Sequence, residues 1–248
     1  MWLAAALSFG VLARYTQHML SMAAGALMAT AFLHLLPEAF ESQARANDLF
    51  LALLLGLVFF FLLDKAELWH HGHDHHHHHH PGDDSHSDHA GHRHASAPAQ
   101  PGSWAILTGD SVHCFGDGIL IASAFMADMR LGAIAALAVL AHEVPHHMGD
   151  LMVLRSGASN KRMALVKVSL AGAVTALGGL VGYWLVDALH DYLPYFLVVA
   201  SSSFVYVALA DLIPQLQKRL SLRETLAQIT WLGLGIGLVT VTSRLAHG

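Results

Sequence analysis

Eight apolar segments limit this chain to the folds that a lipid bilayer permits. A helix needs about 20 apolar residues to cross the hydrocarbon core, where it must satisfy its own backbone hydrogen bonds. Only 12% of the residues are charged, against about 25% in soluble domains. We therefore predict an all-α, polytopic membrane helix bundle with eight transmembrane helices. The segments cover residues 2–13, 19–40, 49–68, 104–127, 131–154, 164–186, 192–214 and 225–243.

The first segment, 2–13, is shorter than the others. As a helix it would reach only about 18 Å, against a hydrocarbon core of about 30 Å. It is therefore either incomplete or enters the bilayer without crossing it, in which case the bundle has seven spans.

Positive charge is unevenly distributed between the loops. If the N-terminus lies outside, only Arg45, Arg130 and Arg244 of the 13 lysines and arginines lie on the outer side. Cytoplasmic loops of membrane proteins carry such an excess of Lys and Arg. We therefore expect a multi-pass protein of the cell membrane, with both termini outside and the long loop 69–103 in the cytoplasm.

The loop 69–103 has the composition of a disordered, metal-binding segment. Most of the chain's 21 histidines lie in it, between His70 and His94, among Asp, Gly, Ser and Pro. Such a segment cannot bury a core, and imidazole binds zinc, copper, iron and nickel. We predict a disordered histidine-rich loop that buffers divalent metal, with an inert linker as the alternative. It separates helices 1–3, at residues 1–68, from helices 4–8, at residues 104–248.

The fourth and fifth segments each carry rows of metal-ligand side chains. Residues three, four and seven apart lie on one face of a helix. On the fourth segment, Asp110, His113 and Asp117 therefore form one row, and Cys114 lies at its flank. The fifth segment carries two adjacent rows, which are His142, His146 and Asp150, and Glu143, His147 and Asp150.

Ionisable groups at mid-membrane are costly unless a partner neutralises them. Two such helices packed face to face would neutralise theirs by sharing a cation, because imidazole and carboxylate bind Zn²⁺ and Fe²⁺. One ion would take His113, Asp117, His142 and His146. Glu143 and Cys114 would hold a second ion, with Asp117 or His146 bridging. The predicted metal ligands are His113, Cys114, Asp117, His142, Glu143, His146 and His147.

Polar residues elsewhere in the apolar segments leave two interpretations open. His34 and Glu38, one helical turn apart near the outer end of the second segment, would form a metal entry point or a polar helix terminus. Asp211, near the inner end of the seventh, would form a cytoplasmic exit or a helix cap.

Two motifs resemble those of the ZIP (Zrt/Irt-like protein) metal transporters, in the branch with histidine-rich loops. That branch shows H-N-F-x-D-G in its fourth helix, where this chain reads His113-Cys114-Phe115-Gly116-Asp117-Gly118. It shows H-E-x-P-H-E-x-G-D in its fifth, where this chain reads "HEVPHHMGD" at 142–150. The stretches "LHLLPEA" at 33–39 and "FVYVALADLIP" at 204–214 look like the family's second and seventh helices.

The resemblance implies eight helices, outward termini and a binuclear site between helices four and five. It also implies uptake of a divalent metal into the cytoplasm by an elevator-like movement, often by a homodimer. Zinc is the leading candidate, with Fe²⁺, Mn²⁺ and Cd²⁺ as alternatives. We expect the lipid bilayer as the surroundings, no nucleic-acid partner and no enzymatic activity. Cys114 replaces the family's Asn and His147 replaces Glu, which makes the second position softer and less anionic.

Three other functions were weighed against uptake. An intramembrane zinc protease would use His142-Glu143-x-x-His146, with Glu143 as general base, but it leaves His113 and Cys114 without a role. A zinc exporter of the cation diffusion facilitator type would use His-x-x-x-Asp pairs, but such exporters have a folded domain after the last helix. A metal sensor that transports nothing also remains compatible with the sequence.

Overall fold

The computed structural model describes residues 9–72, 103–157, 161–216 and 220–247, and every regular element in these ranges is helical. This confirms the all-α prediction for the described part of the chain. Residues 1–8 and most of the predicted histidine-rich loop, 73–102, lie outside it. The elements are α2 (Phe9–Thr30), a π-helical turn (Ala31–Leu35), α3 (Leu36–Phe40), α4 (Ala46–Gly72), α5 (Ser103–Ala127), α6 (Met129–Gly157), α7 (Lys161–Ala188), a 3₁₀ turn (His190–Tyr192), α8 (Leu193–Leu216) and α9 (Leu222–His247).

Helix α2 differs from the predicted arrangement of the first two segments. It begins at Phe9, continues without a break through 14–18, and joins the π-helical turn and α3 in one rod. The predicted boundary between segments 2–13 and 19–40 is therefore wrong. Residues 14–18 are polar, but they contain neither the proline nor the glycine that would interrupt a helix. The outward N-terminus depended on that boundary, so the described helices do not support it.

Several helices have the length and composition of membrane spans. In the described residues, Gln17–Phe40, Ala46–Lys65, His190–Ala210 and Leu222–Arg244 are long and apolar enough to cross a bilayer. Shorter apolar stretches occupy parts of α5 and α7. Large apolar side chains on the outer faces of α4, α7 and α9 are more than half exposed, as lipid contact allows. The chain is therefore a multi-pass membrane helix bundle, in which four spans are clear rather than eight.

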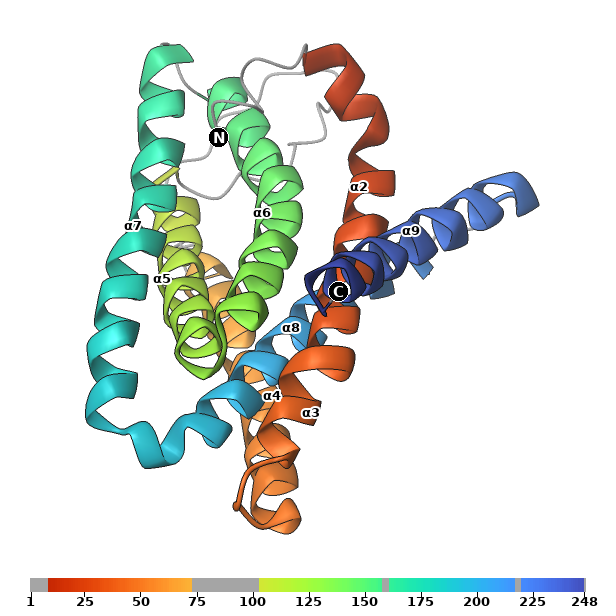
Figure 1. The fold of residues 1–248 in the computed structure, drawn as a ribbon. Coiled ribbons are helices and arrows are strands. Elements are labelled where there is room, and N and C mark those ends of the chain that lie inside the picture. Colours follow the sequence, from red (N-terminus) through yellow and green to blue (C-terminus); the bar gives the residue numbers. More distant parts are fainter. Residues whose placement is uncertain (1–8, 73–102, 158–160, 217–219, 248) are drawn as a thin grey trace, which may run out of the picture.

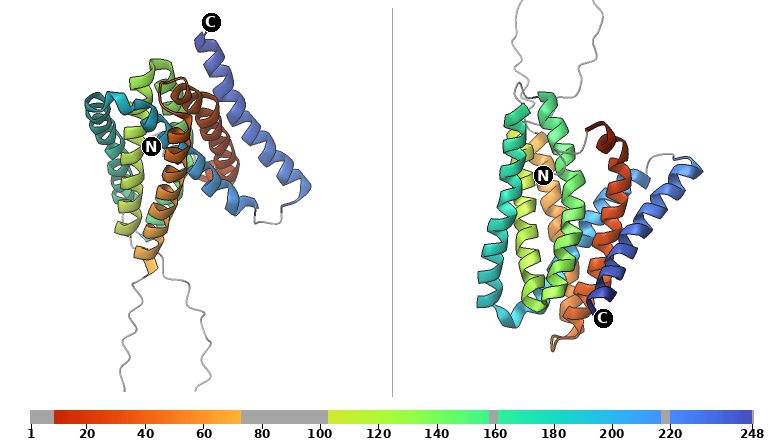
Figure 2. Two further views of the ribbon diagram at one scale, coloured as in Figure 1. Left: turned by 90° about the horizontal axis from the view of Figure 1, so that it is seen from below. Right: turned by 45° about the horizontal axis from the view of Figure 1, so that its top comes forward.

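The helices form a bundle in which α5, α6 and α7 lie side by side and α2 lies next to α6 (Figure 1). Helix α9 packs on α2 at the outer edge, and α4 packs on α8 (Figure 2). The buried core is built from α2, α5, α6 and α8, with many alanines. Small side chains let membrane helices approach closely, so this core places α5 and α6 against α2 and α8.

Helices α5 and α7 approach one another through glycine. A Cβ atom on Gly118 would overlap the carbonyl oxygen of Thr175, and one on Gly178 would overlap that of Phe115. A Cβ on Gly182 would lie 2.7 Å from the Cα of Ile119. Backbone therefore packs on backbone along this interface, and α7 holds the face of α5 that is turned away from α6.

Candidate metal centre

The link between α5 and α6 explains why their polar residues meet. Only Asp128 separates the two helices. Its Oδ1 accepts hydrogen bonds from the backbone N–H groups of Arg130 at 2.8 Å and Leu131 at 3.1 Å, which caps the first turn of α6. In such an antiparallel hairpin, residues at equal sequence separation from the turn lie opposite one another. Cys114 and His142 are equally far from Asp128 in sequence, so the two motifs face each other.

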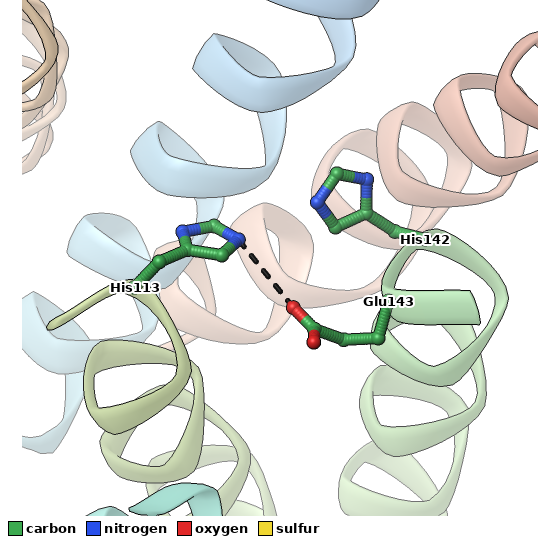
Figure 3. Close-up of side chains that lie close together, drawn as sticks. All are labelled: His113, His142 and Glu143. Atoms are coloured by element: carbon green, nitrogen blue, oxygen red, sulfur yellow. Dashed lines mark ion pairs between the residues drawn. The ribbon is translucent and has the colours of Figure 1, made fainter. Parts of the chain in front are cut away.

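The first group of donors, which we call the nitrogen trio, is His113, His142 and Glu143. One ligand atom from each lies within 4.8 Å of the other two. The Nε2 atom of His113 lies 3.5 Å from Oε1 of Glu143, and both atoms are buried without a hydrogen-bond partner among the described residues. Figure 3 shows the three side chains converging from α5 and α6. Two ligand atoms that face each other beyond hydrogen-bonding distance do not satisfy each other. Both can therefore bind a third group placed between them.

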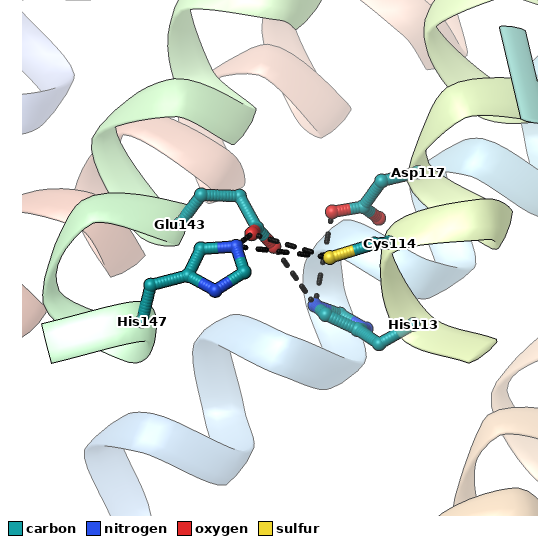
Figure 4. A network of polar contacts seen from close by, with 5 residues as sticks. All are labelled: His113, Cys114, Asp117, Glu143 and His147. Carbon is teal, nitrogen blue, oxygen red and sulfur yellow. Dashed lines mark hydrogen bonds and ion pairs between the residues drawn. The ribbon is translucent and has the colours of Figure 1, made fainter. Parts of the chain in front are cut away.

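The second group, the thiol trio, is Cys114, Glu143 and His147, and all three residues are buried. The sulfur of Cys114 lies 3.6 Å from Oε2 of Glu143 and 3.7 Å from Nε2 of His147. Glu143 and His147, one turn apart on α6, form an ion pair. Figure 4 shows Cys114 approaching the carboxylate of Glu143 from α5, next to His113, and His147 approaching it along α6.

Glu143 therefore belongs to both trios. Its Oε1 faces His113 and its Oε2 faces Cys114 and His147. The sequence predicts Glu143 as a ligand of the second ion, and Asp117 or His146 as the bridge between the two ions. The signal for its shared position was present, since Glu143 directly follows His142 of one row and begins the adjacent row with His147.

Asp117 and His146 lie at the margin of the nitrogen trio. Asp117 is 4% exposed, and its Oδ2 lies 3.7 Å from Nε2 of His113. The ring centroid of His146 lies 5.7 Å from that of His113 and 5.6 Å from that of His142. The structure thus brings all seven predicted ligands to one seam. Asp110 and Asp150 lie on the same helices, outside the residues whose side chains the structure describes.

The charge of this seam is set by its carboxylates and histidines. Two carboxylates, those of Asp117 and Glu143, are buried in the bundle, and their described ion pairs are with histidines. A histidine in its neutral form does not offset the charge of a carboxylate. A buried charge without a partner of opposite charge costs several kcal/mol. A divalent cation between the donors would offset both charges at once.

The other polar residues singled out in the sequence lie away from this hairpin in the chain. His34 lies in the π-helical turn and is partly buried, whereas Glu38 on α3 is exposed. A π-helical turn inside a helix often marks a functional position. Pro37, which has no N–H for the carbonyl of Leu33, lies two residues after this turn, at the start of α3. The side chain of Asp211 lies outside the described set.

Comparison with known proteins identifies the family. The model of the ZIP Zinc transporter family matches residues 13–243. The chain belongs to the ZIP family. It is 30% identical to human zinc transporter ZIP4 over 84% of its length and 27% identical to mouse ZIP13 over 92%. Human ZIP10 is 31% identical over 60% of the chain.

ZIP membership bears on the broad class of activity. ZIP proteins are transporters and not enzymes, so the family does not favour the protease hypothesis, and the exporter hypothesis belongs to another family. The chain spans 40% of the length of human ZIP4 and 70% of mouse ZIP13. The activities of those longer proteins therefore bear on this ZIP chain only by analogy.

Proposed function

We propose that this chain carries divalent metal, with zinc as its main substrate, into the cytoplasm through the seam between α5 and α6. The observation that carries the proposal is the position of Glu143, whose two oxygens face donors of two different trios. A carboxylate in this position can bridge two ions or pass one ion between two positions, and conduction needs neighbouring sites of moderate affinity. Relatives named as zinc transporters support zinc as the substrate.

The spacing of three histidines also suits a zinc ion. The ring centroids of His113, His142 and His146 are 5.6–5.7 Å apart in all three pairs. A point equidistant from them is about 3.2 Å from each centroid, and zinc bound at about 2.1 Å to a ring nitrogen lies at about that distance from the ring centre. Rotation of the rings would direct one nitrogen of each toward that point. Asp117 would supply the anionic fourth ligand.

The direction of transport and the topology form part of the same proposal. With loop 41–45 and the α7–α8 connection outside, the Lys- and Arg-rich stretches around the α6–α7 and α8–α9 connections face the cytoplasm, as the distribution of positive charge favours. The histidine-rich loop then lies inside, where it would receive the ion, and the C-terminus lies outside. Uptake is the direction that the ZIP resemblance implies.

Metal uptake into proteoliposomes tests the proposal. The full chain should accumulate radioactive zinc, and unlabelled divalent cations should compete. A variant with His142→Ala and His146→Ala should lose uptake, because two of the three imidazoles are removed. His190→Ala, a change at an exposed histidine of the 3₁₀ turn, should transport like the parent. Equal uptake by the parent and the double variant would overturn the assignment of the seam.

A further inference from the structure

We propose that Cys114 sets the metal selectivity of this chain, by supplying a sulfur ligand that favours Zn²⁺ and Cd²⁺ over Mn²⁺ and Mg²⁺. This inference rests on the proposed transport function. It assigns to the thiol trio a role that differs from that of the nitrogen trio, namely selection among cations rather than binding of divalent cations in general.

The position of the sulfur is that of a ligand. Cys114 is fully buried, and its Sγ lies 3.6 Å from a carboxylate oxygen of Glu143 and 3.7 Å from a ring nitrogen of His147. Sulfur, oxygen and nitrogen thus converge from two helices, with the three ligand atoms within 4.8 Å of one another. Two ligand atoms of one tetrahedral cation, each about 2.0–2.3 Å from it, lie about 3.3–3.8 Å apart. The sulfur already lies at that distance from the other two atoms, whereas Glu143 and His147 would move apart to admit the ion.

The chemistry of the donors distinguishes the two trios. Imidazole and carboxylate alone, as in the nitrogen trio, bind a broad range of divalent ions, and carboxylates accept Mn²⁺ and Mg²⁺ readily. A thiolate prefers the softer ions, and Mn²⁺ and Mg²⁺ gain little from it. Cys114 is the only cysteine in the chain, so no other thiol can provide this discrimination.

A simpler role for Cys114 would be that of a small apolar core residue, as buried cysteines often are. Its two neighbours argue against that role. An apolar filler would pack against apolar atoms, whereas the sulfur of Cys114 lies within hydrogen-bonding range of a carboxylate oxygen and a ring nitrogen. Packing alone also predicts no change in metal preference when sulfur is replaced by a group of similar size.

Cys114→Ser tests the inference, because it keeps the size of the side chain and replaces sulfur with oxygen. Zinc uptake by the full chain in proteoliposomes would be measured with Cd²⁺ or Mn²⁺ as competitor. The inhibitory strength of Cd²⁺ relative to that of Mn²⁺ should fall by about tenfold or more in Cys114→Ser. Tenfold is the lower end of what loss of a supporting group at a metal site costs. Ser123→Ala, a change at a buried position of α5 whose hydroxyl donates to the carbonyl of Ile119, should leave the ratio unchanged.

A binding measurement that needs no transport separates the two proposals. The purified full chain, titrated with Cd²⁺, should show the ultraviolet charge-transfer band of a cadmium–sulfur bond, and Cys114→Ser should lack it. Zinc uptake without this band, or an unchanged competition ratio in Cys114→Ser, would overturn the role of Cys114 and leave transport standing. The band in a chain that takes up no zinc would support the sulfur site and refute the transport function.

Discussion

Helix α5 packs against α6 and α7 in different ways, and the difference shows how the fold builds a candidate metal centre. Toward α7 it presents Gly118, and the two backbones meet without intervening side chains. Toward α6 it presents His113 and Cys114, whose Nε2 and Sγ atoms lie 3.5 Å and 3.6 Å from the carboxylate oxygens of Glu143. The glycine interface fixes the position of α5, whereas the polar interface brings ligand atoms of both helices to within 4.8 Å of one another. A close contact on one face of α5 therefore preorganises an open set of ligands on the other.

The largest effect on the polar interface should come from Glu143→Gln, because it removes the charge that both trios share and keeps the size of the side chain. We expect metal uptake to fall by about 100-fold or more, beyond the cost of losing an outer-shell partner. Initial rates of uptake by reconstituted protein and metal binding by calorimetry would measure the loss.

A matched change away from the seam controls for the loss of a carboxylate. Glu41, just after α3, is exposed, and Glu41→Gln should leave uptake near the parent level. If Glu143→Gln also transported near that level, then Glu143 would not join the two trios, and the polar interface would differ from the glycine interface only in composition.

Substitutions at the glycine interface should change the stability of the protein rather than its metal uptake. A methyl group on Gly178 would overlap the carbonyl of Phe115, so Gly178→Ala should force α5 and α7 apart. Overpacking of this kind costs about 1–3 kcal/mol. Thermal or denaturant unfolding of the purified protein in detergent would measure it.

Gly116 provides the control, since a Cβ there has no atom of another residue within 4 Å in the described part of the chain. Gly116→Ala should be neutral or stabilising by about 0.5–1 kcal/mol, the usual gain for glycine to alanine in a helix. Equal destabilisation by both changes would mean that loss of glycine flexibility, and not backbone contact, controls this interface.

The two interfaces were not equally predictable from the sequence. The polar rows on α5 and α6 follow from helical spacing, and the short link at Asp128 makes their meeting a matter of geometry. The partner of Gly118 could not be read in the same way, because glycines occur on several helices and nothing local says which of them meet. The shared position of Glu143 depends on side-chain rotamers, which helical periodicity leaves open.

The unbroken course of α2 shows a second limit of what the sequence predicts. Residues 14–18 are polar, which indicated a loop, yet the helix continues through them because no residue there opposes it. Hydropathy reports the free energy of transfer to lipid and not helix propensity. It can therefore mark the end of a membrane span at a point where the helix itself continues. The span count was therefore less predictable than the meeting of the polar rows on α5 and α6.

A third interface, between α4 and α8, tests whether polar contact alone distinguishes a functional seam. There the hydroxyl of Tyr206 donates to Oδ2 of Asp64 at 2.8 Å, and that of Ser202 contacts the carbonyl of Leu53 at 3.1 Å. These contacts are short oxygen–oxygen hydrogen bonds, whereas His113 and Cys114 lie 3.5 Å and 3.6 Å from the carboxylate of Glu143. Tyr206→Phe should therefore cost only about 0.6 kcal/mol, typical for an interhelical hydrogen bond in a membrane protein, and uptake should be unchanged. Tyr183→Phe, at an exposed position on α7, is the control. Loss of uptake in Tyr206→Phe without loss of stability would show that this interface also takes part in transport, and the contrast between satisfied and open polar seams would fail.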